Sequence, residues 1–140
     1  MSKFFGVSLV VLAIVVAVLP QFTTCDYQGF SLKTDTGRLV PMKCLWTARA
    51  EIGIAVPLLA VGGIMVASRR RETKRTLGIL GLALGAFALA LPAGLIGVCT
   101  TMTANCNLIM RPAMLVGGSL AMAVSVAAII VAQRSRDSEP

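Results

Sequence analysis

The chain has 140 residues, of which 56% are hydrophobic and only 14% are charged, and its mean hydropathy is +0.85. Soluble domains carry about a quarter charged residues, so this composition excludes an ordinary soluble fold. The net charge of +7 is concentrated in short segments between apolar runs, a pattern typical of membrane proteins. We therefore expect an integral membrane protein that contacts lipids and binds no nucleic acid.

Four segments are suited to cross a bilayer, because a spanning helix needs about 20 mainly apolar residues. They cover residues 4–24, 48–68, 76–98 and 112–133. No small-residue cleavage site follows the first apolar run, so we expect it to remain as a span. The sequence thus predicts an all-α, four-helix transmembrane bundle over residues 1–140 as a single domain, with outer loops at 25–47 and 99–111.

The cations predict the orientation of this bundle. A short link at 69–75 carries Arg69, Arg70, Arg71, Lys74 and Arg75. With Lys3, Arg134 and Arg136, eight cations lie on the side of the link and both termini, against five on the other side: Lys33, Arg38, Lys43, Arg49 and Arg111. The positive-inside rule predicts that both termini are cytoplasmic, in a protein of the plasma membrane. The link would contact anionic lipids.

Glycines in the predicted spans indicate close helix packing. Gly81 and Gly85 form a Gly-x-x-x-Gly pair, and the pairs Gly62–Gly63 and Gly117–Gly118 lie in the second and fourth spans. Small residues let helix backbones approach closely in a membrane. The first and third spans both end in Leu-Pro followed by an outer cysteine, which predicts two similar αα-hairpins packed side by side. In the first outer loop, residues 30–32 and 38–40 could form a short β-hairpin.

All four cysteines, Cys25, Cys44, Cys99 and Cys106, fall in the two predicted outer loops. Cysteines segregated to the oxidising side of a membrane predict disulfides. Four cysteines allow three pairings, and loop economy favours Cys25–Cys44 with Cys99–Cys106. We expect these bridges to stabilise the outer loops.

Two alternative roles for the cysteines remain. A thiol oxidoreductase that exchanges electrons with quinone usually has a reactive Cys-x-x-Cys pair, and none occurs here. Copper or haem could bind at the outer face, where Met42, Cys44, Met102 and Cys106 offer soft ligands. The chain contains no histidine, so we expect neither metal nor another cofactor.

Charged and aromatic residues gather where the second span begins. Trp46 is expected in the interfacial aromatic belt. Glu51 would be costly to bury alone, so we expect an ion pair with Arg49 or Arg111; a contact with a partner or a proton site is the alternative.

A family resemblance rests on the segment Met42-Lys43-Cys44-Leu45-Trp46-Thr47-Ala48-Arg49-Ala50-Glu51, with Gly97-Val98-Cys99 and with Cys106 ahead of Arg111-Pro112-Ala113. These residues resemble a family of small prokaryotic four-span proteins of unknown function. The family commonly has histidine where this chain has Leu45. It also has a Met-x-Cys sequence where this chain has Asn105-Cys106. These two departures weaken the argument that this chain shares a metal site with the family. Its members resemble accessory proteins encoded beside exporter-type ABC permeases.

No nucleotide-binding loop, paired carboxylates or nucleophile constellation is present in the sequence, so we expect no catalytic residues. The resemblance implies a non-enzymatic accessory or structural subunit of a membrane complex, with an ABC-type permease as partner. The alternatives are the thiol–quinone oxidoreductase and the soft-metal or haem protein.

Overall fold

The computed structural model describes residues 2–23, 32–33, 35–40, 43–68, 70–97 and 106–137. Its long helices are α1 (Ser2–Thr23), α2 (Lys43–Ala67), α3 (Arg71–Ala90) and α4 (Arg111–Asp137). Two π-helical turns, η1 (Leu91–Leu95) and η2 (Cys106–Met110), continue α3 and precede α4.

Four helical segments are long and apolar enough to cross a membrane, which confirms the sequence-based prediction of a four-helix membrane protein. They run over Lys3–Thr23, Lys43–Ala67, Glu72–Leu95 and Cys106–Arg134. The second and fourth begin earlier than the apolar runs predicted, so that residues 43–47 and 106–110 are helical rather than loop. Charged side chains such as Lys43 do not stop a helix at a membrane surface, because their long stems reach toward the headgroups.

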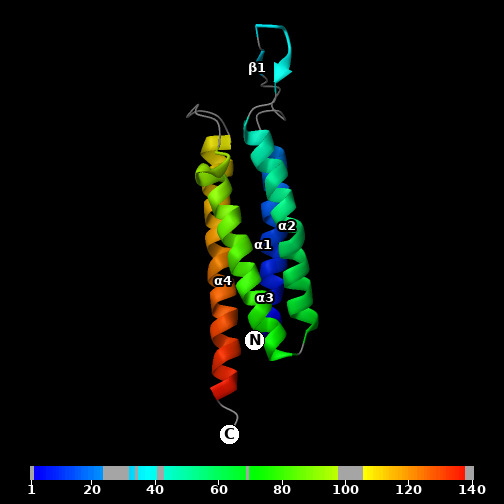
Figure 1. Cartoon of the computed structure of the whole chain (residues 1–140), viewed down its shortest axis with the longest axis vertical. Coiled ribbons are helices and arrows are strands. Elements are labelled where there is room, and N and C mark those ends of the chain that lie inside the picture. The colour runs from blue at the N-terminus through cyan, green and yellow to red at the C-terminus, as the bar shows by residue number, and fades with distance from the viewer. Residues whose placement is uncertain are drawn as a thin grey trace.

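The helices form two antiparallel hairpins, as the internal similarity predicted. Helix α1 packs mainly on α2 and α3 mainly on α4, while α1–α4 and α2–α3 contacts join the hairpins. Figure 1 shows the start of α1, the end of α4 and the α2–α3 link at one end of the bundle. The β strands, η1 and the start of α2 lie at the opposite end, called the outer end below.

A small β-hairpin lies beyond the outer end of α2 (Figure 1). Strand β1 (Leu32–Lys33) pairs antiparallel with β2 (Leu39–Val40), with Leu32 opposite Val40 and Lys33 opposite Leu39. Gly37 lies in the connecting turn at φ 76°, a conformation that glycine adopts without a steric penalty. The predicted hairpin is thus confirmed, with its first strand shifted toward Lys33.

Helices α1 and α2 touch through two glycines. A Cβ atom on Gly6 would lie 2.9 Å from the backbone oxygen of Gly62, and one on Gly62 would lie 3.0 Å from the backbone oxygen of Gly6. The helix backbones are therefore in direct contact, which is how small residues promote helix association in lipid. Gly63 is different, because a Cβ there would meet nothing within 4 Å.

Helices α3 and α4 meet in the same manner. A Cβ on Gly118 would lie 3.1 Å from the backbone nitrogen of Leu89 and 3.2 Å from the oxygen of Gly85. A Cβ on Gly81 would lie 2.8 Å from the Ser125 hydroxyl oxygen. A Cβ on Gly117 would make only an ordinary 3.4 Å contact with a side chain of α1.

Candidate functional site

The first turns of α2 separate a buried face from an exposed one. Cys44, Thr47, Ala48, Glu51 and Ala55 have no exposed surface. Counted from Cys44 they stand at i, i+3, i+4, i+7 and i+11, which places them on one side of an α-helix. Trp46 and Arg49, on the other side, are exposed.

Two hydrogen bonds attach this part of α2 to its neighbours. The Thr47 hydroxyl donates to the backbone oxygen of Gly97, with 2.7 Å between the oxygens. The Gln21 side-chain amide of α1 donates to the backbone oxygen of Ala48 over 3.4 Å. Gly97 adopts φ 81°, in the left-handed region that favours glycine, and its N–H donates to Leu91 O. The start of α2 is therefore held between α1 and the end of α3.

Sulfur-bearing side chains from both hairpins pack together beneath these two hydrogen bonds. Cys44 of α2, Cys106 and Met110 of η2 and Met114 of α4 belong to one hydrophobic cluster, which also includes Val16, Ala48 and Ala55. We call Cys44, Cys106, Met110 and Met114 the sulfur cluster. All four of its side chains are almost fully excluded from solvent.

The structure therefore brings the two segments that surround Cys44 and Cys106 together. The predicted disulfide partners Cys25 and Cys99 lie outside the described residues, as do Met42 and Met102. The disulfide pairing stays a prediction. Within the described ranges, no three His, Cys, Asp or Glu side chains form a group that could hold a metal ion.

Glu51 is buried, and no side chain or backbone group of the described residues bonds to it. Neither carboxylate oxygen has a hydrogen-bond partner in the described part of the chain, so the predicted ion pair with Arg49 or Arg111 is not formed. The reason is geometric, because residues two positions apart on a helix point in nearly opposite directions. Arg49 instead lies over the Trp46 ring, with its guanidinium carbon 5.6 Å from the ring centre. Arg111 is exposed on α4.

Trp46 and Arg49 form an exposed pair at the outer end of α2. The Trp46 side chain is 55% exposed, and a guanidinium within about 6 Å of an indole is attracted by the ring. Such a position suits the boundary between lipid and water, where tryptophan is enriched.

The residues of the predicted basic link lie at the other end of the bundle. Arg70 and Arg75 are exposed and Lys74 is partly buried. Arg69 and the side chain of Arg71 lie outside the described part of the structure. The link is therefore remote from the outer end, with the full length of the helices between them (Figure 1).

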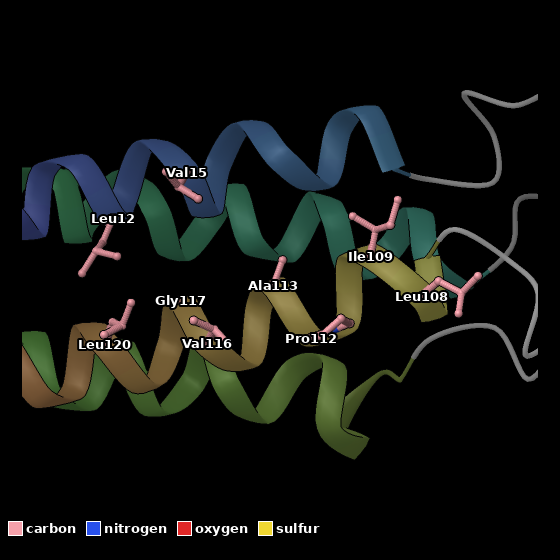
Figure 2. A pocket seen from close by; sticks show the side chains of 9 residues that line it. All are labelled: Leu12, Val15, Leu108, Ile109, Pro112, Ala113, Val116, Gly117 and Leu120. Carbon is pink, nitrogen blue, oxygen red and sulfur yellow. The ribbon is translucent and has the colours of Figure 1, made fainter.

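An apolar groove runs between α1 and α4 on the outer half of the bundle (Figure 2). Its volume is about 500 Å³. Leu12 and Val15 of α1 face α4 across it, and η2 and α4 supply the remaining walls. The lining comprises Leu12, Val15, Leu108, Ile109, Pro112, Ala113, Val116, Gly117 and Leu120.

One comparison with known proteins is informative. The model of a domain of unknown function, DUF4418, matches residues 8–131. The chain belongs to the DUF4418 family. No curated protein and no solved structure matches it. The expected membership in a family of unknown function is thus confirmed, whereas the resemblance to permease-associated proteins stays a prediction.

Several residues that organise this DUF4418 protein were not singled out in the sequence. Gly6 is the only glycine of the first span, which is a usable signal for a close helix contact. Met110 and Met114 follow Cys106 at four-residue intervals, which places them on one side of a helix. Thr47 gives no comparable signal, because its acceptor, the Gly97 carbonyl, is 50 residues away.

Proposed function

We propose that this DUF4418 protein is a non-enzymatic accessory subunit of a membrane protein complex. Its partner would be an integral membrane protein, with an ABC-type permease as the candidate. The observation that supports this proposal is the apolar groove between α1 and α4, which opens toward the surrounding membrane. We infer that a transmembrane helix of the partner occupies it.

The floor of the groove favours a helix over lipid chains. Ala113 and Gly117 of α4 both line it and stand four residues apart, so they lie on one face of the helix. Such a small-x-x-x-small pair lets a second helix approach closely. The rim is apolar and exposed, with Val116 at 58% and Leu108 at 62%. A partner helix would cover these side chains.

The proposal places both termini and the basic link in the cytoplasm of a prokaryotic cell, with the protein in its plasma membrane. The positive-inside rule supports this orientation. The outer end would then face an oxidising compartment, where Cys25–Cys44 and Cys99–Cys106 disulfides could form. Labelling with a membrane-impermeant thiol reagent, before and after reduction, tests both the orientation and the disulfides. Disulfide-bonded outer cysteines should react only after reduction.

The thiol–quinone alternative receives less support from the geometry. Reactive cysteines lie in partly exposed, electropositive surroundings. Cys44 and Cys106 both have no exposed surface and sit among apolar side chains. These two positions suit a structural role better than thiol exchange with a partner protein.

Site-specific photocrosslinking in native membranes tests the groove. A photoreactive residue at Val116 should crosslink to an integral membrane permease, identified by mass spectrometry, whereas one at Val56 on exposed α2 surface should not. Val116→Trp should fill the groove and abolish copurification of that permease, and Val56→Trp should leave it intact. Crosslinks to lipid alone, or equal behaviour of the two positions, would contradict the proposal.

A further inference from the structure

The sulfur cluster fills part of an apolar core with four sulfur-bearing side chains, although aliphatic side chains could fill the same space. Cys44 comes from the first hairpin, and Cys106, Met110 and Met114 come from the second. All four side chains share one buried cluster and are at most 1% exposed. Two cysteine and two methionine side chains thus belong to one buried cluster at the contact between the hairpins.

Sulfur ligands of this kind select a particular metal. Thiolate and thioether are soft ligands that favour Cu(I). Zinc sites usually have four ligands drawn from Cys, His and carboxylates, and the described part of the chain offers no group of three such residues. Hard cations such as Mg²⁺ and Ca²⁺ need several oxygen ligands. The cluster chemistry is therefore that of a Cu(I) site.

Glu51 lies further along α2 and, among the described residues, forms no metal-binding group with Cys44 and Cys106. It lies on the same face of α2 as Ala48 and Ala55, and both alanines belong to the cluster. Its carboxylate is fully buried and both oxygens have no hydrogen-bond partner among the described residues.

We propose that this protein binds one Cu(I) ion through the thiolates of Cys44 and Cys106 and the thioether of Met110, with Met114 packed behind Met110. Binding requires reduced thiols, because a cysteine in a disulfide cannot act as a thiolate ligand. A thiol or phosphine reductant must therefore open any disulfide at these two cysteines before the metal binds. The thioether ligand in this site is Met110, whereas the sequence suggested Met42 and Met102 of the outer loops.

Titration of the reduced, detergent-purified full chain with Cu(I) under anaerobic conditions tests the proposal. A chromophoric Cu(I) chelator serves as competitor, and X-ray absorption identifies the ligand atoms. We expect one Cu(I) per chain with sulfur-only coordination. The Cys44→Ser/Cys106→Ser variant should bind at least about tenfold more weakly, since loss of even outer-shell groups costs that much.

Two methionine variants separate ligation from packing. Met110→Leu conserves side-chain volume, so the fold should persist, while Cu(I) affinity should fall at least about tenfold, since loss of even outer-shell groups costs that much. Met65→Leu is the matched control, because Met65 is equally buried but belongs to the other core cluster, and it should bind normally.

Three outcomes would overturn the proposal. They are wild-type affinity in the double cysteine variant, equal losses in Met110→Leu and Met65→Leu, or a strong loss in Cys25→Ser/Cys99→Ser after reduction. The Cu(I) titration uses this chain without a partner. A negative result would therefore contradict the copper site but not the proposed partner binding.

Discussion

The Thr47 hydroxyl of α2 and the backbone carbonyl of Gly97 are 2.7 Å apart and join the two helical hairpins at the outer end of the bundle. Gly97 follows η1, where the Leu91 carbonyl accepts the backbone N–H groups of Ile96 and Gly97. This chain of hydrogen bonds holds the end of the second hairpin against the start of α2. The sulfur cluster, which contains residues of both hairpins, depends on that alignment.

Replacing Thr47 by Val should destabilise the protein. The change keeps the shape of the side chain but removes the donor to Gly97 O, and such a loss costs about 1 kcal/mol. Thermal unfolding in detergent should show a lower Tm. Thr76→Val is the control, because its hydroxyl is exposed and bonds only within its own helix, to Glu72 O. Equal effects of the two substitutions would argue against a special role for the Thr47 hydroxyl.

Glu51 should not contribute to the stability of the protein. Its buried carboxyl group has no hydrogen-bond partner among the described residues, and an unsatisfied buried polar group costs about 1–3 kcal/mol of stability. Glu51→Leu should therefore maintain or raise Tm in the metal-free protein. Glu72→Leu, at an exposed position, should change Tm little. A clear fall in Tm for Glu51→Leu would show that the carboxylate makes a stabilising contact.

The number of helices was predictable because a bilayer requires long uncharged segments, and the chain has four. The contacts between helices were harder to predict. Arg49 and Glu51 were expected to act together, yet they lie on opposite faces of α2. Trp46 is exposed and its place at the membrane interface stays a prediction, whereas the start of the helix at Lys43 was not expected.

Adjacent glycines illustrate the same limit. Hydropathy does not distinguish Gly62 from Gly63, because both are small and apolar and lie in the same span. Only the rotation of α2 relative to α1 decides that Gly62 meets Gly6 while Gly63 meets open space. The rotation of a helix about its axis is set by packing against its neighbours, so it cannot be predicted from a single sequence.

This difference makes the first glycine pair a direct test of hairpin packing. Gly62→Ala should destabilise the protein by about 1–3 kcal/mol, the usual cost of overpacking, because its Cβ would press on backbone atoms of Gly6 and Val10 at 3.0 Å. Gly63→Ala should be neutral or slightly stabilising, since alanine is the better helix former. Chemical unfolding in mixed detergent measures both. The reverse order would mean that α2 is rotated relative to this structure.

The second hairpin offers an equivalent pair in α4. Gly118→Ala places its Cβ 3.1 Å from the backbone nitrogen of Leu89, an atom that cannot move without shifting α3. Gly117→Ala would contact only the Val16 side chain, at 3.4 Å. We therefore expect a loss of about 1–3 kcal/mol for Gly118→Ala and little change for Gly117→Ala in the same unfolding experiment. Because Gly117 lines the proposed partner groove, copurification of the permease provides a second readout. Gly118→Ala should lower stability, whereas Gly117→Ala should weaken partner binding in a protein of normal stability.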